Sequence, residues 1–160
     1  MRAGADAAVR QALDEALRKW ARETIAAEVG AGDAVSVVHD DPVVLAQVAR
    51  HLVDEVYRAP GQPRLRIALH YGEVFTSRRP GDGLPVIAGG DGVLCAVRVE
   101  PRVEPGQIWV TEEFRAQLAE RPSLWRTTPV TGPDGANRIN VKKEGGTEPD
   151  LWVELYRLEF

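Results

Sequence analysis

Few residues of this chain belong to local sequence motifs that indicate catalysis or ligand binding. Gly81-Asp82-Gly83 is glycine-rich, but no Gly-Lys-Ser/Thr follows it, so the sequence contains no P-loop for phosphate. His70 follows an alternating strand pattern without the carboxylate and serine of a catalytic triad, which favours a structural histidine. Cys95 lies in an apolar helical stretch and is typical of a small core residue. These patterns alone define no reaction.

The composition limits the classes of function. A net charge of −4 and a pI near 5.4 argue against a nucleic-acid partner. A single cysteine excludes an internal disulfide and favours a reducing compartment. No apolar stretch approaches the ~20 residues of a membrane span, and no leader pattern is present. We therefore expect a cytoplasmic protein with no membrane partner, folded as one domain over residues 1–160.

The first half of the chain predicts two helices and a hairpin. Apolar residues in 5–22 recur at helical spacing. The β-prone runs 24–29 and 34–38 flank a short Gly/Asp connection, which is typical of a hairpin. Asp41 and Pro42 are favoured residues for starting a helix, and a Pro-Gly-Gln-Pro segment ends it.

The second half predicts alternating strands and helices around a sheet. Residues 65–74 alternate as a strand does, and residues 77–83 are rich in Arg, Pro and Gly, as in a mobile surface loop. Asp91 is expected to cap a short helix over 93–99, and Thr111 to cap the next helix. The other predicted strands are 107–110, 124–128, 138–143 and 151–158. The order α-β-β-α-β-α-β-α-β-β-β predicts an α/β (α+β) domain with a mixed sheet covered by helices.

Several stretches, taken in order, resemble the catalytic domain of class III adenylate and guanylate cyclases. Gly32-Asp33 followed by an apolar strand is similar to that family's Gly-Asp-Gly hairpin. The strand 65–74 contains a His-x-Gly-x-Val turn, and residues 90–100 resemble the family's Gly-Asp-x-Val-Asn-x-Ala-x-Arg helix. Residues 105–113 match the Pro-Gly-Gln-Ile-x-Val-Ser-Glu segment, and residues 139–158 resemble the final hairpin. The order and spacing of these motifs over 32–158 identify the chain as a member of this family.

The resemblance implies a ferredoxin-like palm with a mainly antiparallel sheet and helices packed on it. In the family, two palms dimerise head to tail and enclose active sites at their interface. Two carboxylates there hold two divalent metals, which bridge the triphosphate and activate the ribose 3′-hydroxyl. Mg²⁺ or Mn²⁺ is therefore expected here only together with a bound nucleoside triphosphate.

Transferring the family's roles residue by residue gives an incomplete site. The resemblance places Asp33 at the second metal aspartate, Arg98 at the catalytic arginine, and Lys142 or Lys143 at the phosphate-binding lysine. Leu94 stands at the asparagine that orients the ribose, and a leucine cannot hydrogen-bond a ribose. The strand with the first metal aspartate precedes the first helix in the family, and this sequence begins at that helix. The base-selecting lysine falls among Ala26, Ala27 and Glu28.

Each of these residues also has a structural interpretation. Asp33 is a common turn former at a hairpin tip, and Arg98 is compatible with an amphipathic helix surface. Lys142 and Lys143 are typical of solvated strand ends. Two hypotheses follow: a pseudo-cyclase that binds a nucleotide or a related palm in bacterial signalling, or an active cyclase completed by a partner subunit. A third alternative is a longer natural chain that supplies the missing strand.

Overall fold

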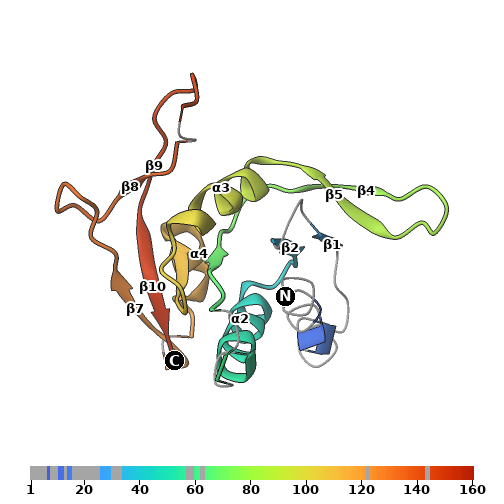
Figure 1. The fold of residues 1–160 in the computed structure, drawn as a ribbon, viewed down its shortest axis with the longest axis horizontal. Coiled ribbons are helices and arrows are strands. Elements are labelled where there is room, and N and C mark those ends of the chain that lie inside the picture. Colours follow the sequence, from blue (N-terminus) through green and yellow to red (C-terminus); the bar gives the residue numbers. More distant parts are fainter. Residues whose placement is uncertain are drawn as a thin grey trace.

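The computed structural model describes residues 7, 11–12, 14–15, 26–29, 34–56, 60–61, 64–121, 123–142 and 145–160. Helices interrupt a series of short strands along the chain (Figure 1). The elements are β1 (Ala26–Val29), β2 (Val35–Val38), α2 (Pro42–Val56), β3 (Ile67–Leu69), β4 (Phe75–Arg78), β5 (Pro85–Gly89), α3 (Asp91–Val99), a 3₁₀ turn (Glu100–Arg102), β6 (Ile108–Thr111), α4 (Glu112–Leu118), β7 (Arg126–Pro129), β8 (Ile139–Asn140), β9 (Trp152–Val153) and β10 (Leu155–Glu159). None of the described helices is long and apolar enough to cross a membrane.

A four-stranded sheet in the order β3-β6-β10-β7 forms the centre of the molecule. β3 runs parallel to β6, whereas β10 is antiparallel to both of its neighbours, β6 and β7. The remaining strands pair as three antiparallel two-stranded units, β1-β2, β4-β5 and β8-β9. The expected mixed, mainly antiparallel α+β architecture is therefore confirmed.

Strand β6 shows how the sheet is buried on both faces. Ile108 and Val110 point to one face, where they pack with Phe114 and Leu118 of α4 and with small residues of α2. Trp109 points to the other face and packs with Val99 at the end of α3. Because side chains alternate along a strand, both faces of β6 are apolar, and helices cover both. Figure 1 shows α3 above and α2 below this part of the sheet.

Of the three residues predicted to cap a helix N-terminus, two do so in the structure. The Asp41 carboxylate accepts a hydrogen bond of 2.9 Å from the Val43 backbone N–H at the start of α2. Thr111 caps α4 by accepting from the Phe114 N–H. The prediction that Asp91 caps α3 was wrong, because Gly90 is the N-cap residue and no side chain caps this helix. Asp91 lies in the first turn instead, where a negative charge suits the helix dipole.

The hairpin β1-β2 is confirmed, with Ala26 opposite Val38 and Val29 opposite Val35. The predicted helix over 5–22 lies mostly outside the described residues, and those described within it are helical. Of the late predicted strands, the one over 138–143 is short, and the one over 151–158 is divided at Glu154 into β9 and β10.

One prediction near β3 was wrong, and one before α3 was incomplete. The strand expected over 65–74 is confined to β3, because the chain then leaves the sheet through Gly72, whose backbone packs closely against His70 and Gly92. Most of the loop expected over 77–83 is indeed a turn, but the prediction missed the strands β4 and β5 on either side, in which Thr76 lies opposite Ile87 and Arg78 opposite Pro85. The Pro-Gly-Asp-Gly segment is the turn of this hairpin, and the β-prone residues on either side form its strands.

Candidate functional site

A cleft of about 810 Å³ opens between α3, the start of α4 and the segment that leads through β9 into β10. α3 contributes residues one turn apart, so a single side of the helix faces the cleft. The lining residues are His70, Asp91, Leu94, Cys95, Arg98, Glu112, Glu113, Glu148, Pro149, Asp150, Leu151, Trp152, Val153 and Glu154. The cleft therefore includes the helix on which the sequence placed the catalytic arginine.

Two glycines hold α3 close to the turn after β3. The Gly92 N–H donates a hydrogen bond of 3.0 Å to the Glu73 carbonyl oxygen. Gly90 adopts a φ of 121°, and a Cβ on this residue would overlap with the same carbonyl oxygen. Only glycine tolerates both this backbone conformation and this approach. The Gly-Gly-Asp-Gly segment thus fixes the position of the cleft wall.

Arg98 is engaged by a carboxylate of the same chain. Its Nη2 lies 3.4 Å from Oε1 of Glu148, and the arginine side chain is 18% exposed. The other carboxylate oxygen of Glu148 is buried without a hydrogen-bond partner among the described residues. Lys142 is held in a similar way, with its Nζ 3.8 Å from Oδ1 of Asp150. The short segment from Glu148 to Asp150 therefore binds Arg98 and Lys142, two of the three cations that the sequence assigned to phosphate.

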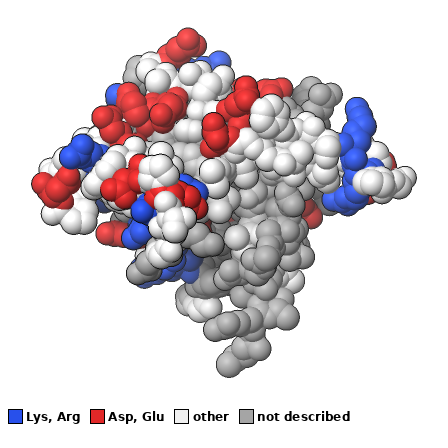
Figure 2. Space-filling model, turned by 90° about the horizontal axis from the view of Figure 1, so that it is seen from above, with Lys and Arg blue, Asp and Glu red and all other residues white. Residues whose placement is uncertain are grey.

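Carboxylates outnumber cationic side chains in the cleft lining. Among the described residues that line the cleft, Arg98 is the only lysine or arginine. The acidic lining residues are Asp91, Glu112, Glu113, Glu148, Asp150 and Glu154. Viewed from above, red acidic side chains gather over the left part of the molecule (Figure 2). Such a lining repels an anion, unless cations accompany it.

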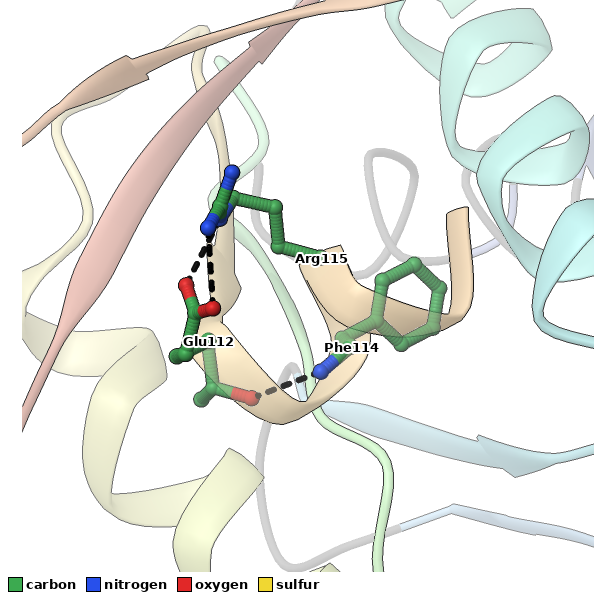
Figure 3. Close-up of polar contacts among 4 residues, drawn as sticks. Glu112, Phe114 and Arg115 are labelled. Carbon is green, nitrogen blue, oxygen red and sulfur yellow. Dashed lines mark hydrogen bonds and ion pairs between the residues drawn. The ribbon is translucent and has the colours of Figure 1, made fainter. Parts of the chain in front are cut away.

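In the first turn of α4, the carboxylate of Glu112 forms an ion pair with Arg115. Glu112 accepts two hydrogen bonds from Arg115, at 2.6 and 2.8 Å (Figure 3). The hydrogen bond from Arg115 lowers the pKa of Glu112. The Arg115 guanidinium also stacks over the Tyr156 ring at 4.5 Å from its centroid, which ties α4 to β10. This pair is structural.

His70 and Cys95 occupy the inner wall of the cleft. A hydrogen bond of 2.8 Å joins His70 Nδ1 and Thr111 Oγ1, and Glu113 lies 3.8 Å from the same nitrogen. Burial lowers the pKa of His70, against the opposing effect of Glu113. Burial also raises the pKa of the Cys95 thiol to about 11, so the thiol stays protonated and is a poor nucleophile.

The structure brings together only part of the predicted site. Arg98 lines the cleft, and Leu94 lies beside it with 46% of its surface exposed. Lys142 is not a lining residue, although it contacts the lining residue Asp150. Asp33 and Lys143 lie outside the described residues. Within the described ranges, no three His, Cys, Asp or Glu side chains gather to hold a metal ion, so we assign no step to one.

Glu148 and Asp150 are site residues that the sequence interpretation missed. The signal was the hairpin that ends the chain. Ile139 pairs with Val153 and the Val141 N–H donates to the Leu151 carbonyl, so Lys142 comes opposite Asp150. Asp150 lies one residue before the predicted strand 151–158, so pairing the predicted strands finds these charges only if the second strand is extended by one residue in the observed register.

Solved structures share this fold. The guanylate cyclase domain of RhGC from Catenaria anguillulae, in complex with GTP, is 18% identical over 94% of this chain and 79% of that chain, with a TM-score of 0.67. Adenylate cyclases from Trypanosoma brucei in their monomeric state give 16% identity over 97% and 77%, with a TM-score of 0.73. This chain has the fold of a nucleotide cyclase catalytic domain.

A dimeric guanylyl cyclase domain of the RhoGC fusion protein from Blastocladiella emersonii is similar to the same extent. It is 17% identical over 98% of this chain and 82% of that chain, with a TM-score of 0.71. No protein-family model and no curated protein matches the sequence. At this identity the likeness concerns the fold, and it confirms the cyclase palm that the sequence motifs predicted.

Proposed function

We propose that this cyclase palm is a non-catalytic domain that works in signalling or regulation by binding a related palm. The single observation that carries the proposal is the engagement of Arg98 by Glu148 inside an acidic cleft. A triphosphate bound there would have to displace the carboxylate from the arginine and sit among further negative charges. Both effects oppose binding of the substrate of a cyclase.

Leu94, which lies one turn before Arg98 on the same wall of the cleft, adds to this argument. In the family resemblance it replaces the asparagine that orients the ribose, and its side chain reaches the cleft without any hydrogen-bonding group. Losing a positioning group and the free arginine removes several kcal/mol of transition-state stabilisation, at ~1.4 kcal/mol for each tenfold in rate. That loss is large enough for the domain to keep the palm fold and yet turn over no triphosphate.

Binding of a second palm is supported by the exposed side of α3. Leu94 and Val97 are 46% and 52% exposed on a helix of only nine residues. Apolar side chains that stand together at a surface usually mark an interface. We therefore assign the exposed face of α3 that carries Leu94 and Val97, at the edge of the cleft, to the contact with a partner palm.

The test is an assay of purified protein with ATP, GTP, CTP and UTP, in the presence of Mg²⁺ or Mn²⁺. We expect no 3′,5′-cyclic nucleotide above the background of a protein-free control. Turnover that disappears in the Asp33→Ala variant would contradict the proposal. Turnover that persists in the Asp33→Ala variant would instead point to a contaminating enzyme. The matched control for Asp33→Ala is the Asp33→Asn variant.

The competing function is an active cyclase completed by a partner subunit. One observation favours it, namely that Arg98 lines the cleft as the cyclase resemblance requires. The alternative predicts that adding the partner palm restores turnover and that Arg98→Ala abolishes the restored activity. The proposed function predicts no turnover in the same mixture.

A further inference from the structure

Strands β2 and β3 each have one edge that pairs with no other described strand. β2 pairs with β1, and β3 pairs with β6 at the end of the four-stranded sheet. The Ile67 N–H donates to the Gln107 carbonyl oxygen on the β6 side. Because successive N–H groups of a strand point to opposite edges, the N–H and C=O of Ala68 point to the unpaired edge of β3.

The two strands lie over the same part of α2. Val35 and Val37 of β2 and Ile67 of β3 pack against Val48 and Leu52, the buried pair on this side of α2. In Figure 1, β2 lies between β1 and the green strand β3, above α2. β2, α2 and β3 follow one another as a strand–helix–strand unit whose two strands do not pair with each other. Such a split unit has a place for one further strand in its middle.

The apolar cluster beneath this place is only partly covered. Val48 and Leu52 are its buried members in the described ranges. The aliphatic residues of α2, β2 and β3 around them are only half-buried, namely Val35, Val37, Val44, Leu65 and Ile67. The neighbouring cluster around Ile108 and Phe114 has more buried members. A strand between β2 and β3 would therefore cover apolar surface and satisfy two rows of backbone groups at once.

We propose that a partner protein inserts an extended strand between β2 and β3. Its backbone would hydrogen-bond to both unpaired edges, and every second side chain would point to Val48 and Leu52. The chemistry of the place specifies β-branched apolar residues at those alternate positions. The inserted strand needs only about four or five residues, because β2 has 4 residues and β3 has 3.

The described part of the chain has no spare strand for this place. Every strand in the described ranges already pairs with another. The described residues before β1, at 7, 11–12 and 14–15, are helical, and Ala12 packs against the same cluster as a helix residue. We therefore assign the place to a second protein. The residues involved are separate from Leu94 and Val97 on α3, so the inference goes beyond the proposed palm contact.

A strand supplied in trans tests the inference. The probe is a soluble carrier protein that ends in the segment Lys-Thr-Val-Thr-Val-Thr-Lys. We expect the full chain to bind it in isothermal titration calorimetry. Hydrogen exchange should then slow at least roughly tenfold at the backbone amides of 35–38 and 67–69, because both edges become paired. The matched carrier has proline in place of its central threonine and valines, and it should bind at least roughly tenfold more weakly, because proline has no N–H to donate.

A pair of variants locates the contact on this chain. Val37→Thr puts a hydroxyl group into the half-buried cluster and should weaken carrier binding at least roughly threefold, because the hydroxyl loses its water when the strand covers it. Val86→Thr makes the same change in β5 and should leave binding unchanged. Circular dichroism should show that both variants are folded.

A third arm separates the possible sources of the strand. The same segment is fused before residue 1 through a flexible linker, which supplies it at high effective concentration. The fused strand should protect the same amides and block the carrier. Protection by the fused segment without any binding of the carrier would assign the place to an upstream segment of the chain itself and overturn the inference. So would equal binding of the proline carrier, or unchanged exchange at β2 and β3. The palm contact at α3 and the turnover assay are unaffected by any of these results.

Discussion

Replacing Glu148 with glutamine should free Arg98 and create a measurable anion site. The substitution keeps the size of the side chain and removes the charge that now lies 3.4 Å from the arginine. It also removes a carboxylate that repels any phosphate entering the cleft. We therefore expect Glu148→Gln to bind ATP or inorganic tripolyphosphate more tightly than the parent protein.

The magnitude follows from the geometry of the pair. Two unit charges at ~4 Å attract by about 1 kcal/mol in water and about 4 kcal/mol at the effective dielectric of a protein surface. Glu148 is 43% exposed, so solvent screening places the net effect at the lower end, about 1–2 kcal/mol. Since ~1.4 kcal/mol corresponds to tenfold in Kd, the gain should be roughly tenfold.

Isothermal titration calorimetry of three variants measures this gain. Glu120→Gln removes the same charge from an exposed position outside the cleft and should bind as the parent does. Arg98→Ala in the Glu148→Gln background should cancel the gain, because the freed guanidinium is its source. Unchanged binding in Glu148→Gln, or a gain that survives Arg98→Ala, would refute the reasoning.

Two further predictions concern stability. Phe114 is 1% exposed between α4 and the sheet. Urea denaturation should therefore show that Phe114→Ala lowers the free energy of unfolding by about 3–5 kcal/mol. The control Phe75→Ala, at an exposed position, should change the free energy of unfolding by no more than about 0.5 kcal/mol. Burial lowers the pKa of His70 in the folded state, so the unfolded chain binds more protons and stability should fall as pH drops below about 6.5. His70→Gln should flatten this part of the stability profile, and an unchanged slope would contradict the assignment to His70.

Local chemistry determined many of the elements. Asp41 followed by Pro42, and Thr111 followed by two glutamates, begin the helices α2 and α4 as capping preferences predict. The β-branched run 34–38 gave β2 because its residues fit a pleated, half-buried surface. The motifs in order also identified the cyclase palm, which the shared fold of solved cyclase domains confirms.

The sequence interpretation failed where contacts between distant segments decide the outcome. Residues 70–74 alternate like a strand, yet they leave the sheet, because Gly72 must approach Gly92 on α3. The strands β4 and β5 were missed, because the Arg-, Pro- and Gly-rich turn between them dominated the local pattern. Gly90 rather than Asp91 caps α3, since its backbone conformation and its contact with Glu73 have no signature in local propensity.

By itself the sequence determined the palm and placed Arg98 on the helix that lines the cleft, because both depend on local patterns and motif order. Only the tertiary structure showed that Arg98 forms an ion pair with Glu148. Glu148 lies fifty residues further along the chain, and the final hairpin carries it to within 3.4 Å of Arg98. A charge pair across that separation depends on how α3 and the final hairpin pack against the same sheet, which no local pattern records.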